Sequence, residues 1–119
     1  MPRPSRHRLV IDGRTTAMVE IADTWARRAR GMLARRALPA ALLLRPCASV
    51  HGVGMRVPLD VAFLTPEGAV LDVIVLRPWS APRGRRGAAA VLEAPAGSFA
   101  RWDLTRGSAV QTAPDREPS

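Results

Sequence analysis

Hydrophobic and polar residues alternate along several short stretches of the chain, as they do in strands with one buried face. DVAFLT at 60–65 and AVLDVIVLR at 69–77 flank the turn residues Pro66, Glu67 and Gly68, which predicts a β-hairpin. RLVID at 8–12 and TAMVEIAD at 16–23 flank Gly13 and predict a second hairpin. The same reasoning predicts strands at 41–45, 49–55, 88–94 and 108–112, a short helical turn at 98–104, and an exposed loop at 78–87.

One longer segment has helical rather than strand character. Thr24 stands where an N-cap residue belongs, and the apolar residues from Trp25 to Leu33 recur at spacings of three and four. Arginines occupy the other face of this predicted helix and form a basic surface of Arg27, Arg28, Arg30, Arg35 and Arg36. A solvated helix face is the simplest interpretation, and an acidic or phosphate-bearing partner is the alternative.

These elements together predict an α+β fold that is mainly antiparallel β. About seven strands and one helix without βαβ alternation favour a small, partly closed, barrel-like sheet with one peripheral helix. We expect a single domain at residues 8–111, with flexible termini at 1–7 and 112–119.

The formal charge of +8 suggests nucleic acid at first sight, but the chain has no lysine, so arginine carries all of the positive charge. The excess lies in the N-terminal part of the chain. Up to Arg45 there are ten arginines against three acidic residues, a net of +7, and the remainder nets +1. Trp25 is the only aromatic residue among the helix arginines, so base stacking has little support and nucleic acid is not the expected partner.

The number of cysteines limits the possible cofactor sites, and the length of the apolar runs limits the possible cellular location. A single cysteine excludes an internal disulfide and a cysteine-rich zinc site, and we expect no metal and no cofactor. No apolar stretch follows the basic N-terminal residues, and the longest apolar run, at 37–44, is too short to span a bilayer. We therefore expect a cytoplasmic protein without a transmembrane segment.

Candidate chemistry concentrates in CASVHGVGMRVPLD, residues 47–60. Cys47 and His51 are four residues apart, which in a strand is about 13 Å, whereas a catalytic dyad requires about 3 Å. This spacing predicts that Cys47 is a small buried hydrophobic residue. The strand would place His51 and Met55 on one face, where the histidine is either structural or lines a pocket.

Two carboxylates complete the set of candidates. Asp60 can accept backbone N–H bonds at a turn or pair with Arg56. Glu93 stands in an apolar strand, so it should face solvent or a cationic neighbour. The candidate ligand-binding residues are therefore His51, Met55, Arg56, Asp60 and Glu93.

Three segments in this order resemble the bacterial and archaeal domain-of-unknown-function family 192. They are the helix residues Thr24, Arg28 and Gly31 to Leu33; then Pro58-Leu59-Asp60 leading to Gly68; and then Leu92-Glu93 leading to Ala96-Gly97. The resemblance spans about Met18 to Val110. It implies a compact β-rich fold with a peripheral helix, and it implies no established activity.

The chain departs from the family pattern in one informative place. Many members have Trp-Met-Lys-Asn-Thr shortly before Pro-Leu-Asp, whereas this chain has His51-Gly52-Val53-Gly54-Met55, a His-x-x-x-Met variant. The Gly-Asp near the end of the family pattern is Gly107-Ser108. No role of the Trp-Met-Lys-Asn-Thr run can therefore be transferred.

Three functions remain open from the sequence. The first is a non-enzymatic ligand-binding or accessory protein that holds a small polar or anionic ligand, or a protein partner, near His51. The second is a small hydrolase or transferase that uses His51 with Asp60 or Glu93, although no glycine-rich phosphate loop, Gly-x-Ser-x-Gly or HExxH motif is present. The third is nucleic-acid or acidic-partner binding through the arginine-rich helix.

Overall fold

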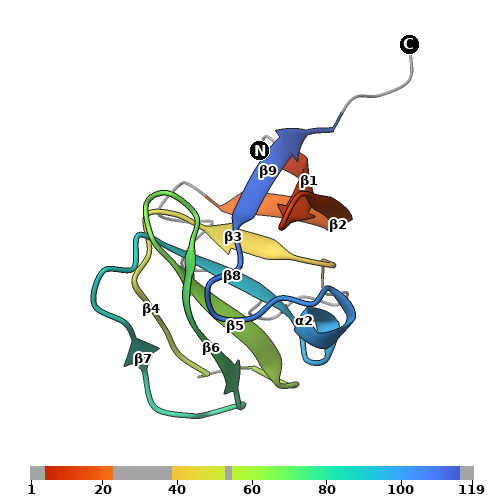
Figure 1. The fold of residues 1–119 in the computed structure, drawn as a ribbon. Helices are drawn as coiled ribbons and strands as arrows, with labels where there is room; N and C mark the ends of the chain where they lie inside the picture. Colours follow the sequence, from red (N-terminus) through yellow and green to blue (C-terminus); the bar gives the residue numbers. More distant parts are fainter. Residues whose placement is uncertain (1–4, 23–38, 53–54, 116–119) are drawn as a thin grey trace.

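A computed structural model describes residues 5–22, 39–52 and 55–115, which form strands and one short helix (Figure 1). In chain order the elements are β1 (Ser5–Ile11), β2 (Arg14–Ala22), β3 (Leu42–Leu44), β4 (Ser49–Val50), β5 (Leu59–Leu64), β6 (Val70–Leu76), β7 (Arg83–Gly84), β8 (Ala90–Pro95), α2 (Ser98–Arg101) and β9 (Val110–Pro114).

One large sheet organises the molecule, with the strand order β6-β5-β8-β3-β2-β1-β9. All neighbouring strands in it are antiparallel except β2 and β3, which are parallel. The two edge strands approach each other at the Ala69–Ala109 bridge, where Val70 N–H donates to the Ser108 carbonyl over 2.9 Å. The sheet is not closed into a barrel, so the mainly antiparallel α+β prediction is confirmed but its barrel-like form is not.

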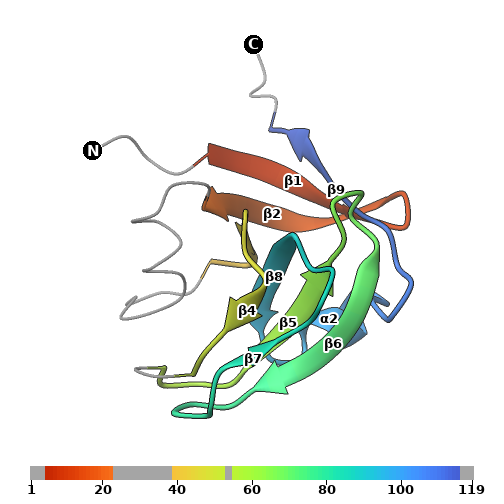
Figure 2. The ribbon, with the colours of Figure 1, turned by 90° about the vertical axis from the view of Figure 1, so that its left-hand side faces the viewer.

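Both faces of the central strands are buried, and each face supports its own hydrophobic core. Alternate residues of a strand point to opposite faces, so Ala62 and Leu64 of β5 join one core, whereas Val61 and Phe63 join the other. The first core is completed by α2 and by strands β1 and β9. The second core is covered by the segment around β4 and β7, which form a two-stranded sheet in front of β5 and β8 in Figure 2.

Both predicted hairpins are confirmed, and their turns have the residues that such turns require. Asp12 and Gly13 join β1 to β2 with φ values of 50° and 81°, the left-handed pair of a tight hairpin turn. Between β5 and β6, Thr65 N–H donates to the Ala69 carbonyl over 2.9 Å, and Gly68 has a φ of 89°. Glycine is needed at this last position because the φ is positive and the Val110 carbonyl leaves no room for a side chain.

Other predictions require correction. In the described part of the predicted strand at 49–55, only Ser49 and Val50 lie in a strand, β4, and the Gly52 carbonyl accepts the Trp79 N–H of the loop after β6. The predicted loop at 78–87 contains β7, which pairs with β4. Strands β1 and β9 also extend beyond the expected boundaries, to Ser5 and Pro114. The predicted helix with its five arginines lies outside the described residues.

Candidate functional site

The buried carboxylate of Asp60 connects two stretches that are far apart in sequence. Asp60 lies in β5 with 7% of its surface exposed. Its Oδ2 atom accepts hydrogen bonds from the backbone N–H of Gly97 over 2.9 Å and of Phe99 over 3.0 Å. It therefore satisfies orphan donors at the start of α2 and fastens this helix to the sheet. Of the roles considered from the sequence, the structure shows the acceptance of backbone N–H bonds.

Glu93 lies close to Asp60 in the sheet but points the other way. Strand register places Asp60 opposite Ala94 and Glu93 opposite Val61, so the two carboxylates lie on opposite faces of the sheet. Glu93 is only 6% exposed, so the expectation that it faces solvent is wrong. The alternative, a cationic neighbour, remains a prediction.

His51 and Met55 do not share the single strand face expected from the sequence. Met55 N–H donates to the Gly52 carbonyl over 3.2 Å, whereas residues three apart in one strand are about 10 Å apart. Met55 is consequently buried in the second core, whereas His51 and Arg56 are exposed. The structure therefore separates the methionine from the histidine.

Cys47 packs against apolar residues as expected, but it is less buried than predicted. It is half-buried, and it packs against the second core. Its Sγ atom donates to the Ser49 carbonyl over 3.1 Å, and its backbone N–H donates to the Ala89 carbonyl over 3.0 Å. These contacts fix the entry of the chain into β4.

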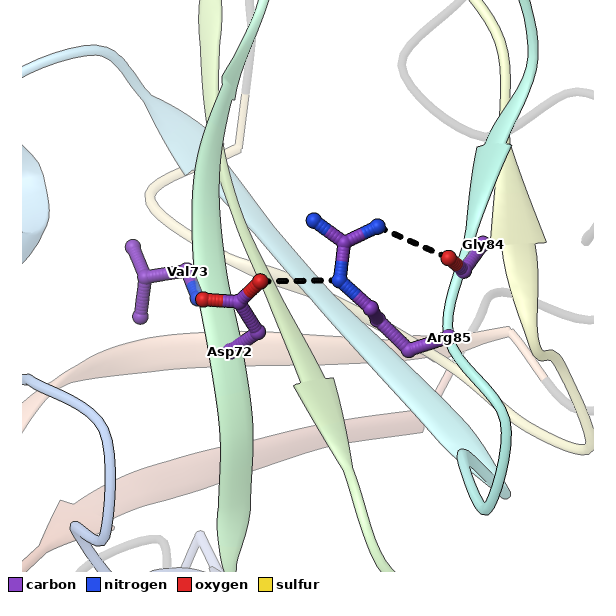
Figure 3. Close-up of polar contacts among 4 residues, drawn as sticks. All are labelled: Asp72, Val73, Gly84 and Arg85. Atoms are coloured by element: carbon purple, nitrogen blue, oxygen red, sulfur yellow. Dashed lines mark hydrogen bonds and ion pairs between the residues drawn. The ribbon is translucent and has the colours of Figure 1, made fainter.

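An ion pair that the sequence analysis missed fastens the β7 segment to the main sheet (Figure 3). Arg85 Nε lies 2.8 Å from Asp72 Oδ2, and Arg85 Nη1 donates to the Gly84 carbonyl over 2.8 Å. The guanidinium also lies over the ring of Phe63, 5.1 Å from its centroid. The hydrogen bond from Arg85, and then the one from Val73 N–H, lower the pKa of Asp72.

A groove of about 710 Å³ opens beside the first core, where the edges of the sheet approach each other. Leu43, Leu64, Ala90 and Val110 form its floor and belong to or pack against that core. Arg45, Thr65, Glu67, Gln111 and Thr112 bring polar groups to its walls and rim. None of the ligand-binding candidates from the sequence lines this groove.

Neither a metal cluster nor a membrane-spanning helix is found in the described residues. Across 5–22, 39–52 and 55–115 no group of three His, Cys, Asp or Glu side chains could hold a metal ion. In the same part of the chain, no helix has the length and apolar character needed to cross a membrane.

Comparison with known sequences identifies a family. The model of DUF192, described as "Uncharacterized ACR", matches residues 7–112. A UPF0127 protein of Pyrococcus abyssi is 38% identical over 84 residues, which cover 66% of this chain and 72% of that relative. A UPF0127 protein of Pyrococcus furiosus is 34% identical over the same shares of the two chains.

Two crystal structures share the fold. A protein from Sinorhizobium meliloti 1021, described as a proposed transcription regulator, superposes with a TM-score of 0.81 at 23% identity and covers 94% of this chain and 97% of its own. A protein of unknown function from Novosphingobium aromaticivorans superposes with a TM-score of 0.74 at 24% identity, with 92% and 93% covered. At this identity the likeness shows a common fold, and none of these descriptions specifies an activity for the family.

Proposed function

The chain belongs to the DUF192 family, whose description specifies no activity, and we propose from its geometry that it is a non-enzymatic ligand-binding domain. The observation that carries the proposal is the groove between the β5–β6 turn and β9. Its volume of about 710 Å³ falls within the range of about 300–1,000 Å³ that is typical of small-molecule sites.

The lining of the groove indicates the class of ligand. An apolar floor of leucine, valine and alanine side chains would accept a hydrocarbon or aromatic body. The polar residues of the lining are exposed or half-buried, so a ligand would keep its own polar or charged group toward solvent. The proposed ligand is therefore a small amphipathic molecule rather than the small polar or anionic ligand, or protein partner, expected near His51.

The arrangement of the carboxylates argues against the hydrolase alternative. One oxygen of Asp60 accepts two backbone N–H bonds, and Glu93 points to the opposite face of the sheet. The alternative needs His51 beside one of these carboxylates, but His51 is exposed whereas both carboxylates are buried. The third function, binding through the arginine-rich helix, depends on residues outside the described part of the chain and stays a prediction.

Ligand binding in the groove can be tested by substituting a large side chain for one of its lining residues. Thr112 of β9 lines the groove, whereas the next residue, Ala113, does not, and alternation places its side chain on the other face of β9. We expect the amphipathic dye 1-anilinonaphthalene-8-sulfonate to bind the native chain with a rise in fluorescence. Thr112→Trp should abolish this binding, and Ala113→Trp should leave it unchanged.

A panel of amphipathic metabolites in a thermal-shift assay then identifies the natural class of ligand, because a ligand that binds only the native state raises Tm. Equal dye binding by the two tryptophan variants, or no stabilisation by any amphipathic compound, would contradict the proposal.

A further inference from the structure

The exposed large hydrophobic residues of the described chain gather at the end of the β5–β6 hairpin that lies away from the groove. They are Trp79 at 71%, Val75 at 53% and Val57 at 43% exposure. Leu59 and Leu76 pair at this end of the ladder, with Val57 two residues before Leu59 and Trp79 three residues after Leu76. Val75 pairs with Asp60 and therefore lies on the opposite face of the sheet from Leu59 and Leu76. Tryptophan is rarely so exposed without a reason, since its indole is large and mostly apolar.

The backbone holds Trp79 in place at a conformational cost. Its φ of 59° lies in the left-handed region, which is unfavourable for a bulky aromatic residue. Trp79 N–H donates to the Gly52 carbonyl over 2.6 Å, and Ser80 Oγ donates to the Arg77 carbonyl over 2.7 Å. Strain of this kind persists where the surroundings enforce it, and it is concentrated at functional positions.

Gly52 makes this arrangement possible. A Cβ atom at that position would stand 2.8 Å from Ser80 Oγ and would collide with the Arg77 carbonyl. The loop after β6 therefore packs directly on the backbone beside His51. Because glycine permits this approach, contact with the backbone at Gly52 fixes the position of the loop backbone at Trp79.

The two chain segments that meet near Trp79 contain arginines and no acidic residues. Residues 40–59 and 73–92 contain no Asp or Glu, and pairing of β4 with β7 brings the two segments together. Five arginines of these segments are exposed, namely Arg45, Arg56, Arg77, Arg83 and Arg86. The net charge of the whole chain does not reveal that these segments are basic, because the acidic residues lie in other segments.

We propose that Trp79 and Val57, flanked by Arg56 and Arg77, form a docking surface for an acidic segment of a partner protein that also carries apolar side chains. Tryptophan and arginine are among the residues most enriched at the energetic centre of protein interfaces. The arginines complement carboxylates, and Trp79 and Val57 require apolar groups that a phosphate backbone does not supply. A second copy of this chain would present like charge and is disfavoured.

Fluorescence anisotropy with labelled probes tests this surface on the full chain. The main probe is a peptide that alternates Glu with Leu, and the matched probe has Ser in place of each Leu. We expect the Glu–Leu peptide to bind at least ~10-fold more tightly than the Glu–Ser peptide and to weaken as salt is added. Trp79→Gly, which suits the positive φ, and the double variant Arg56→Gln with Arg77→Gln should each weaken binding about 10-fold or more.

Controls separate this surface from general attraction to a basic protein. Arg8→Gln removes one exposed charge on β1, several strands away, and should change binding less than about 2-fold, a difference of about 0.4 kcal/mol at about 1.4 kcal/mol per tenfold. Equal affinity for both peptides, or absence of binding by the Glu–Leu peptide, overturns the proposal. The proposal is also overturned if a single-stranded oligonucleotide or phosphatidylserine vesicles bind more tightly than the Glu–Leu peptide and this binding is lost in Trp79→Gly. The surface then belongs to that other partner. Dye binding in the groove should be unaffected by these variants, so the two proposals fail separately.

Discussion

Replacing Asp60 with alanine tests whether this carboxylate is structural, as its contacts indicate. The substitution removes the acceptor of two backbone N–H bonds, from Gly97 and Phe99, at a position that is 7% exposed. Both donors would be left at the start of α2 without their partner. Water would reach the Phe99 donor poorly, because its bond is buried.

The expected loss is large for one side chain. Hydrogen bonds to a charged group contribute about 1.5–3 kcal/mol each, and loss of a helix cap alone costs about 0.5–2 kcal/mol. We therefore expect Asp60→Ala to lower the free energy of unfolding by about 3 kcal/mol, against about 5–15 kcal/mol for a typical domain. Asp60→Asn keeps an oxygen acceptor and loses only the charge, so it should cost about 1 kcal/mol.

Urea denaturation followed by far-UV circular dichroism measures these differences. The exposed Asp115→Ala serves as the matched control and should change the free energy of unfolding by less than about 0.5 kcal/mol. A loss below about 1 kcal/mol in Asp60→Ala would refute the structural assignment, since two bonds to a buried carboxylate cannot contribute so little.

Three further predictions concern the loops that cover the second core. Gly52→Ala should lower the free energy of unfolding by about 2–3 kcal/mol in urea denaturation, because the added methyl group collides with the Arg77 carbonyl; an unchanged value would mean that the loops are not in contact. Trp79→Gly should raise it by about 0.5–1 kcal/mol, since the release of left-handed strain exceeds the entropic cost of glycine, and a lower value would contradict the strain argument. Asp72→Asn should lower Tm at neutral pH, where the ion pair with Arg85 is intact. Because the pKa of Asp72 is lowered in the folded state, the pair stabilises the fold above the unfolded pKa of about 3.9, and this stabilisation is lost as pH falls through the folded pKa. The Tm values of the variant and the native chain should therefore converge in acid, and a constant difference in Tm across pH would exclude the ion pair as its cause.

Local sequence signals were sufficient for the two hairpins. In 60–77 the alternating residues and the turn from Pro66 to Gly68 agree with each other, and the structure follows both. In the same way, the sequence suggested that Asp60 accepts backbone N–H bonds. The sequence could not show which N–H groups donate to Asp60, because Gly97 and Phe99 lie 37 and 39 residues further along the chain.

The incorrect predictions come from contacts between distant segments. The stretch 49–55 alternates like a strand, yet the contact of Gly52 with the loop at Trp79 turns the backbone and separates His51 from Met55. Strand β7 has two residues, too few to form a pattern. The ion pair of Asp72 with Arg85 likewise depends on how the β7 segment folds back over β5.

The groove could not be found from the sequence because no single stretch contains it. Its lining comes from β3 and the residues after it, the β5–β6 turn, the start of β8 and the first half of β9. Each contributes a few ordinary residues, such as Leu64 or Thr112, whose common position is created by the curvature of the sheet and the approach of its two edges.

A crystal structure of the chain soaked with 1-anilinonaphthalene-8-sulfonate, or with the metabolite that raises Tm most, tests the central claim most directly. We expect electron density for the aromatic body between Leu64 and Val110, with the charged group toward solvent. Density for the ligand elsewhere, with the groove filled only by water, would contradict it.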